Sequence, residues 1–138
     1  MNYTTVLTVA VTLSIPKDEC RMKAVLKYLR DQYVIHQVAG LHLPVFAPDN
    51  IRRCRITFQG RVQKVGFRLE VCELAQRLQL TGYCRNLENG DVLAELQGPG
   101  NKITFLVSCM ESLKRIRIRS KITEELPLIP GETGFYKA

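Results

Sequence analysis

The 138-residue chain has no tryptophan, only two histidines and no long apolar run. A helix needs about 20 consecutive apolar residues to cross a bilayer, and the sequence contains no such segment. The N-terminus also lacks a basic stretch followed by an apolar core and a small-residue cleavage site, which is the pattern of a signal peptide. We therefore expect a cytoplasmic globular protein with no membrane partner.

Metal-binding and disulfide patterns are missing as well. The five cysteines form no CxxC pair, show no zinc-ligand spacing, and are odd in number. Most lie between apolar residues, which favours reduced thiols that fill the core. Neither His36 nor His42 has a cysteine or carboxylate at a useful spacing. The sequence thus predicts neither a metal nor another cofactor.

The chain does have an excess of positive charge, with a net charge of +7. Residues 1–50 hold five Lys/Arg against four Asp/Glu, a balance of +1, and residues 51–138 hold fifteen against nine, a balance of +6. The second segment therefore carries most of the basic field. Such a field attracts anions, and it fits either a small phosphorylated molecule or a nucleic acid.

Residues 1–50 form an N-terminal extension that ends in the turn-rich stretch Ala47–Asn50. Apolar and polar residues alternate over Leu7–Leu13, which predicts a half-buried strand. Pro16 suits the first turn of a helix, and Val34–Ala39 is predicted as a second strand. This strand–helix–strand extension is too small for a core of its own. We expect it to pack on the second segment or to join two copies in a homo-oligomer.

Residues 51–138 are predicted to form an α+β domain of the ferredoxin-like βαββαβ class. Apolar stripes at helical spacing predict two helices, one beginning near Phe67 and one capped by Asn101. In this fold the strands form an antiparallel sheet with both helices on one face. Alternation and turn signals place the strands at Cys54–Gln59, Thr81–Leu87, Asp91–Gln97, Arg115–Ile122 and Gly134–Lys137, the last being an additional terminal strand.

The junction between the first strand and the first helix is the most distinctive candidate site. Its sequence, Gly60-Arg61-Val62-Gln63-Lys64-Val65-Gly66-Phe67-Arg68, combines two glycines with three basic residues at the start of a helix. Converging backbone N–H groups, the positive end of the helix dipole and the Arg68 guanidinium would together form a phosphate-binding loop. A plain strand-to-helix turn with Arg68 in solvent fits the residues equally well.

Asn86, just before the Asn89-Gly90 turn, is the second candidate. Its amide can donate a hydrogen bond to one water and also accept one from it. From the residues alone, an ordinary turn asparagine is the better interpretation.

These two stretches are similar to the two signatures of the acylphosphatase family. Gly60–Arg68 resembles the pattern G-x-V-Q-G-V-x-F-R, and Gly82–Val92 resembles G-[aromatic]-[V or similar]-x-N-x-x-x-G-x-V. Gln97-Gly98 and Gly131–Phe135 fit the family as well, so the resemblance covers about residues 52–138. It does not reach the N-terminal extension, whose role it leaves open.

The resemblance implies a metal-independent hydrolase that splits small acyl phosphates into a carboxylate and inorganic phosphate. By the match, Arg68 and the backbone N–H groups of Arg61–Phe67 would bind the phosphoryl group, and Asn86 would position the attacking water. The substrate phosphate itself would take the proton of that water. Phosphoryl transfer asks chiefly for positioning and charge stabilisation, so neither a histidine nor paired carboxylates are required.

Lys64 departs from the family pattern, which has glycine at this position of the loop. If the position needs a positive φ, a lysine there costs about 1 kcal/mol. Its side chain would either fill the pocket or add charge beside the phosphate. A non-catalytic anion-binding or protein-interaction module with the same fold is therefore the alternative function.

The basic run Lys114–Lys121 is compatible with nucleic-acid binding, but a second interpretation is favoured. In the resembling fold this strand lies at the sheet edge, where charge deters edge-to-edge pairing. An RNA-recognition module of the same topology stacks bases on aromatic residues of its two central strands. Here those strands contain one aromatic residue, Phe58, on the same face as Ile56. We therefore expect no nucleic-acid partner. On the basic strand, one face would carry Arg115, Arg117, Arg119 and Lys121.

Overall fold

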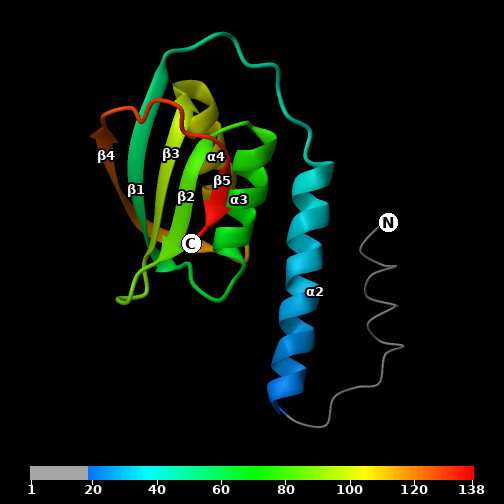
Figure 1. Ribbon diagram of the computed structural model, residues 1–138. Helices are drawn as coiled ribbons and strands as arrows, with labels where there is room; N and C mark the ends of the chain where they lie inside the picture. Colours follow the sequence, from blue (N-terminus) through cyan, green and yellow to red (C-terminus); the bar gives the residue numbers. More distant parts are fainter. Residues whose placement is uncertain (1–18) are drawn as a thin grey trace. The chain divides into compact units, whose positions relative to one another are not determined.

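The computed structural model describes residues 19–138 (Figure 1). The predicted strand Leu7–Leu13 and the helix start at Pro16 lie outside the described residues. The chain divides into two compact units, residues 1–42 and residues 43–138.

The described part of the first unit is a single helix, α2 (Glu19–Gly40). The helix predicted in the extension is confirmed, but the strand predicted at Val34–Ala39 is wrong, because α2 continues through these residues. Val34 and Val38 are both buried and are four positions apart. The apolar residues of this segment therefore follow the helical period, which places such positions on one face, and not the alternation of a strand.

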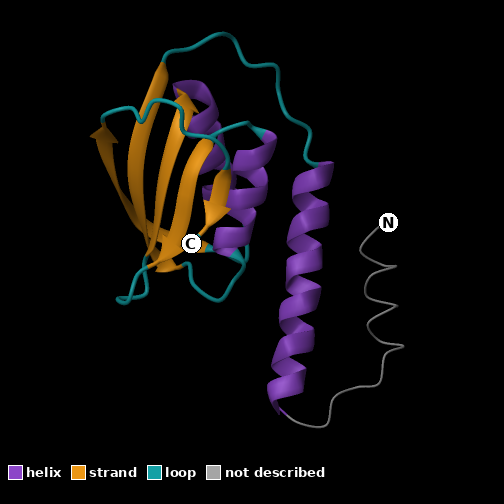
Figure 2. Ribbon diagram, in the orientation of Figure 1, coloured by secondary structure: helices purple, strands orange, loops and turns teal. Residues whose placement is uncertain are grey.

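The second unit is a five-stranded sheet with two helices on one face (Figure 2). Its strands lie in the order β4-β1-β3-β2-β5, and all neighbours are antiparallel except the parallel pair of β2 and β5. This is the predicted ferredoxin-like α+β fold, with the predicted terminal strand added as β5. In chain order the elements are β1 (Ile51–Arg61), α3 (Phe67–Arg77), β2 (Thr81–Asn86), β3 (Val92–Pro99), α4 (Gly100–Ser112), β4 (Arg117–Leu126) and β5 (Phe135–Lys137).

Apolar side chains of the sheet and both helices form the core. Phe58 of β1, Leu74 of α3 and Leu106 of α4 are all buried. Burying a side chain of this size fully stabilises the fold by about 1.5–3 kcal/mol. The rings of Phe58 and Phe67 pack with their centroids 4.9 Å apart. The last core residue of β1 thus contacts the first residue of α3, and this contact fixes both ends of the loop between them.

Two local predictions in this unit are corrected. β4 lies at the sheet edge as expected, but it begins at Arg117, so Arg115 precedes the strand and does not share its basic face. Asn101 lies in the first turn of α4 and does not cap it. The Asp49 carboxylate accepts the Asn101 N–H at 2.8 Å instead, because an acidic side chain brought in from outside the helix satisfies that donor equally well.

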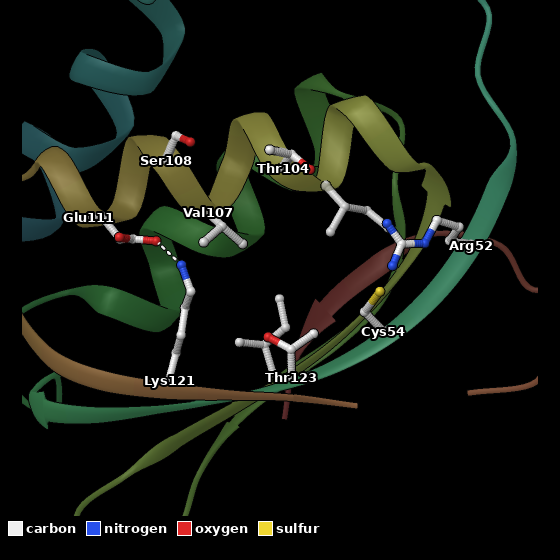
Figure 3. Close-up of a pocket in the computed structure, with 10 residues that line it drawn as sticks. Arg52, Cys54, Thr104, Val107, Ser108, Glu111, Lys121 and Thr123 are labelled. Carbon is white, nitrogen blue, oxygen red and sulfur yellow. Dashed lines mark hydrogen bonds and ion pairs between the residues drawn. The ribbon is translucent and has the colours of Figure 1, made fainter. Parts of the chain in front are cut away.

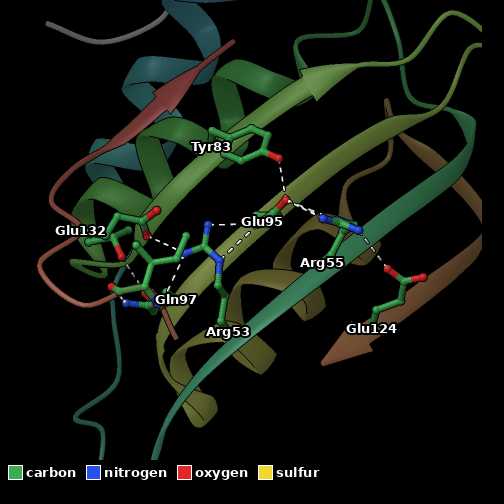
Figure 4. Close-up of polar contacts among 9 residues, drawn as sticks. Arg53, Arg55, Tyr83, Glu95, Gln97, Glu124 and Glu132 are labelled. Atoms are coloured by element: carbon green, nitrogen blue, oxygen red, sulfur yellow. Dashed lines mark hydrogen bonds and ion pairs between the residues drawn. The ribbon is translucent and has the colours of Figure 1, made fainter. Parts of the chain in front are cut away.

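The sheet face opposite the helices carries a buried polar cluster (Figure 4). Arg53 of β1 is 2% exposed, and its Nε and Nη2 donate to Glu95 of β3 at 3.2 and 3.1 Å. Its Nη1 donates at 2.7 Å to Glu132, in the connection between β4 and β5. Gln97 exchanges two hydrogen bonds, of 3.0 and 2.8 Å, with the backbone of Ile129 in the same connection. The cluster therefore holds this connection against the sheet.

Candidate active site

The loop predicted to bind phosphate connects β1 to α3. Gly60, Lys64 and Gly66 all have positive φ, at 131°, 62° and 80°. Gly60 lies where β1 shifts register against β4, and a Cβ atom there would lie 2.2 Å from the carbonyl oxygen of Arg117. Only glycine allows this approach, so the loop leaves β1 at a fixed point.

The N-terminus of α3 completes the loop. Gly66 immediately precedes the helix and provides no side-chain cap. The first N–H groups of a helix have no partner within it, and they carry the positive end of the helix dipole. An anion held by the loop would therefore find both hydrogen-bond donors and a favourable field at this end of α3.

Lys64 adopts the left-handed backbone conformation. The family pattern has glycine at this position, and glycine adopts this conformation without strain. Its φ of 62° is sterically costly for a residue with a Cβ atom, by about 1 kcal/mol. The side chain is exposed. The position thus does have a positive φ, and a lysine adopts it.

The side chain of Gln63 attaches the loop to the turn between β2 and β3. Its Nε2 donates to the carbonyl oxygens of Leu87 at 2.7 Å and Asp91 at 2.9 Å. These two residues are also joined by the Leu87 N–H, which donates to the Asp91 carbonyl at 2.8 Å. The resemblance to the family predicts only a backbone role for Gln63. In the sequence, the place of Gln63 within the loop motif is the signal that could have indicated these side-chain hydrogen bonds.

Arg68 lies in the first turn of α3 and reaches the C-terminal end of β2. Its Nη1 donates to the carbonyl oxygen of Ala138 at 2.9 Å, and the Ala138 N–H donates to Cys84 of β2 at 2.8 Å. Burial raises the pKa of the Cys84 thiol, and the Arg68 charge acts in the opposite direction, which is consistent with their proximity. Arg68 itself is half-buried.

Asn86 is the last residue of β2 and pairs with Val92 of β3. Its side chain is exposed. The turn that follows is stabilised by Asn89, whose Oδ1 accepts the Asp91 N–H at 3.0 Å, and by Gly90 at a φ of 98°. A different asparagine therefore fills the turn role that the residues alone suggested for Asn86. The fold brings Asn86, Arg68 and the Gln63 side chain to the same end of β2.

Arg115 and Glu70, neither of which the sequence predicts as a site residue, both contact this loop region. Arg115 donates from Nε to the Val65 carbonyl at 2.8 Å and from Nη2 to Glu70 at 2.7 Å. The Glu70 side chain is 6% exposed. Burial raises the pKa of Glu70, and the hydrogen bond and charge of Arg115 oppose this rise. In the sequence, the available signal for the pair is that Glu70 comes three residues after Phe67 and four before Leu74, on the apolar side of the predicted helix.

A separate cavity of about 200 Å³ opens between α4 and strands β1 and β4 (Figure 3). Its wall includes Ile56, Ile103 and Val107, and Lys121 forms an ion pair with Glu111 across it. None of the predicted site residues lines this cavity.

Residues 19–138 contain neither a metal-binding cluster of side chains nor a membrane-spanning helix. No three His, Cys, Asp or Glu side chains in this part of the chain gather closely enough to hold a metal ion. In the same residues, no helix combines the length and apolar character needed to cross a membrane.

Comparisons with known proteins agree with this arrangement. The acylphosphatase family model matches residues 54–136. The acylphosphatase of Clostridium beijerinckii is 41% identical over 81 residues, which are 56% of this chain and 87% of that protein. The acylphosphatase of Rubrobacter xylanophilus is 38% identical over 85 residues, covering 61% of this chain and 77% of the relative.

A solved structure shows the same fold. The crystal structure of acylphosphatase from Bacillus subtilis superimposes with a TM-score of 0.59 and 27% identity, covering 64% of this chain and 99% of that one. The match to the family extends over more than half of this sequence and includes the loop, α3 and the end of β2. Through residues 54–136, the chain belongs to the acylphosphatase family.

Proposed function

We propose that this protein hydrolyses the carboxyl-phosphate bond of small acyl phosphates to a carboxylate and inorganic phosphate. The observation that supports the proposal is the loop of residues 60–68, which ends at an uncapped helix N-terminus with Arg68 in its first turn. Asn86, the proposed water-positioning residue, is the last residue of β2. Membership of the acylphosphatase family supports the same activity. A small anionic substrate also fits the charge excess of residues 51–138.

In the proposed mechanism the loop binds the phosphoryl group. Backbone N–H groups of residues 61–67 and the Arg68 guanidinium donate to its oxygens, and they stabilise the charge that spreads over these oxygens in the transition state. Arg68 suits this role because its planar fork can donate twice to a phosphate.

Asn86 orients the water in line with the bond that breaks. The water oxygen forms a bond to phosphorus while the bond from phosphorus to the acyl oxygen breaks, and the acyl group leaves as a carboxylate. The water proton passes to a phosphate oxygen. Because a carboxylic acid has a pKa near 4, its anion leaves without a proton from the enzyme. Positioning and charge stabilisation therefore suffice, without a metal or a phosphorylated enzyme.

A reducing compartment such as the cytoplasm suits the protein. All five cysteines are free thiols. Burial raises the pKa of Cys72 to about 11 and also raises the pKa of Cys84, so both stay protonated and unreactive at neutral pH.

Hydrolysis of benzoyl phosphate in the presence of a chelator tests the proposal. We expect turnover by the intact chain and a loss of at least about 1,000-fold in Arg68→Ala, because a cation on the transferring phosphoryl group contributes that much. Asn86→Ala should lose a similar factor, since the water is no longer oriented. Arg119→Ala removes an exposed arginine of β4 and serves as the control for net charge. Activity in both site variants equal to that of the control would contradict the proposal.

One observation favours a second candidate function, a non-catalytic anion-binding module. Lys64 holds a strained conformation in the middle of the loop. If the lysine blocks turnover while the backbone donors remain, the intact chain binds inorganic phosphate but hydrolyses nothing, and Lys64→Gly restores a large activity. Titration with phosphate beside the hydrolysis assay separates the two functions.

A further inference from the structure

The peptide bond between Val65 and Gly66 is held in one orientation by a side chain from outside the loop. The Val65 carbonyl accepts the Nε hydrogen of Arg115 at 2.8 Å. This peptide bond is trans, as are all those described in residues 19–138. In a trans peptide the C=O and the N–H point in opposite directions. The Gly66 N–H therefore points away from Arg115.

The side of the loop away from Arg115 is the one that the proposed function assigns to the phosphate. Arg115 also bonds to Glu70, which lies inside the protein, with its side chain 6% exposed. The guanidinium thus occupies the protein side of the loop. The Gly66 N–H, on the opposite side of the peptide, joins the donors at the start of α3 that the proposed function assigns to the phosphate.

The local chain does not fix this orientation by itself. Gly66 has no Cβ and a φ of 80°, in a region that glycine enters and leaves at little cost. The peptide before such a residue can rotate unless another group holds it. The hydrogen bond from Arg115 provides that restraint.

Glu70 in turn fixes Arg115. Its carboxylate accepts the Nη2 hydrogen at 2.7 Å, while the Nε hydrogen of the same guanidinium is bonded to Val65. A rigid planar fork with two partners has little freedom to turn. Glu70 is itself fixed in the first turn of α3, where its N–H donates to the Gly66 carbonyl at 3.0 Å.

We propose that Arg115, held by Glu70, is a positioning residue that turns the Gly66 N–H toward the bound phosphoryl group. The inference rests on the proposed function and deepens it. Arg115 does not touch the substrate in this role. It acts through the backbone of the loop, and its contribution is realised in the transition state, when the phosphoryl oxygens gain charge.

A first experiment measures the orientation of the amide directly. The residual dipolar coupling of the Gly66 N–H in isotope-labelled, partially aligned protein reports the direction of this bond. We expect the coupling to change, or the signal to broaden, in Arg115→Met and to remain native in the control Arg119→Met. An unchanged Gly66 coupling in Arg115→Met would overturn the inference, whether or not the protein hydrolyses acyl phosphates.

Kinetics provide the second readout. Removing one preorganised donor from an oxyanion site costs about 100–1,000-fold in kcat, and a misdirected donor loses part of that. We expect kcat for benzoyl phosphate to fall about tenfold or more in Arg115→Met, with a smaller change in KM. Arg115→Lys should recover only part of the loss, because an ammonium lacks the fork that spans both partners. A kcat equal to that of the native protein in Arg115→Met would contradict the inference.

A further variant separates positioning from folding. Arg115→Met leaves the buried Glu70 carboxylate without this partner, which could destabilise the protein on its own account. Combining it with Glu70→Gln removes the buried charge. We expect the double variant to recover thermal stability and to keep the low kcat. If kcat recovers together with stability, the loss came from the buried charge, and the positioning role is wrong.

The outcomes distinguish the inference from the proposed function. If the native chain hydrolyses the substrate and Arg115→Met does so equally well, the positioning role fails and the proposed function stands. If the native chain neither hydrolyses benzoyl phosphate nor binds inorganic phosphate, the proposed function fails, and the Gly66 coupling still decides whether Arg115 orients the loop.

Discussion

Arg53 and Arg68 lie in the same domain and use the same side chain in opposite ways. Arg53 is buried on the sheet face opposite the helices, where its guanidinium bonds to the carboxylates of Glu95 and Glu132 (Figure 4). Arg68 is half-buried at the start of α3, and its Nη1 donates to the backbone oxygen of Ala138 at 2.9 Å. Among residues 19–138, no Asp or Glu side chain forms an ion pair with Arg68.

The difference separates structural from functional charge. A buried charge is tolerated only when other groups of the protein satisfy it, and its removal leaves those groups unpaired. A charge that no acidic side chain neutralises can still interact with an anionic ligand. We therefore expect substitutions at Arg53 to change stability and substitutions at Arg68 to change activity.

The matched pair Arg53→Met and Arg68→Met tests this comparison most strongly. Breaking a buried ion pair by removing one partner costs about 3–5 kcal/mol, so Arg53→Met should lower the free energy of unfolding by about 3 kcal/mol. Arg68→Met should leave that free energy within about 0.5 kcal/mol and reduce kcat at least about 1,000-fold. Urea unfolding and benzoyl phosphate hydrolysis measure both effects.

The comparison breaks if the two variants respond alike. A large loss of stability in Arg68→Met would mean that this arginine is a structural bond to Ala138. If folded Arg53→Met had a specific activity far below that of the native protein, the buried polar cluster around Arg53 would also contribute to the active site. Measuring Arg53→Met at a temperature where it is folded keeps the second outcome clear.

The acid sensitivity of the protein should come from the same cluster. Burial opposes ionisation of Glu95, but hydrogen bonds from Tyr83, Arg53 and Arg55 outweigh it and lower its pKa. In Glu132, burial is likewise outweighed, chiefly by the hydrogen bond from Arg53, and the pKa is lowered. Both carboxylates bind protons more weakly in the folded than in the unfolded state.

Their stabilisation is therefore complete above the unfolded value of about 4.3 and is lost as pH falls through the lower folded values. Glu70, whose pKa burial raises, contributes in the opposite direction. We expect the urea midpoint to fall on acidification below about pH 4, and to fall less steeply in Arg53→Met. Equal slopes in the two proteins would place the acid-sensitive groups elsewhere.

At the loop, a smaller effect is expected from Gln63→Leu. This change removes two hydrogen bonds, to the carbonyls of Leu87 and Asp91, each contributing about 1 kcal/mol. Because these bonds attach the loop to the turn after Asn86, we expect kcat to fall about tenfold as well. Gln76→Leu removes a hydrogen bond of the same kind, to Phe135, from the last turn of α3 and is the matched control. A tenfold loss in the control would show that kcat responds to stability alone.

The sequence predicted the fold and located the loop because both depend on local patterns. The alternation of Ile56 and Phe58 and the motif around Arg68 are visible in consecutive residues. The arginine contacts are not, because Arg53 meets Glu132 across 79 positions and Arg115 meets Val65 across 50. Val34–Ala39 was misjudged because six apolar-rich residues fit a strand as well as the end of a helix.

Lys64→Gly is expected to have the smallest effect on stability. The lysine has a φ of 62°, and glycine removes a strain of about 1 kcal/mol while adding about 0.5 kcal/mol of backbone entropy to the unfolded chain. The expected net gain is therefore about 0.5 kcal/mol.

Gln79 provides the control, because it has a φ of 59° after α3, away from the loop, and is exposed. Gln79→Gly should gain the same stability without a change in activity. If Lys64→Gly changes kcat by no more than about threefold, the lysine strains the backbone only locally and does not affect catalysis. A large gain of kcat in Lys64→Gly, without a gain in Gln79→Gly, would instead indicate that the native loop binds an anion but does not cleave it.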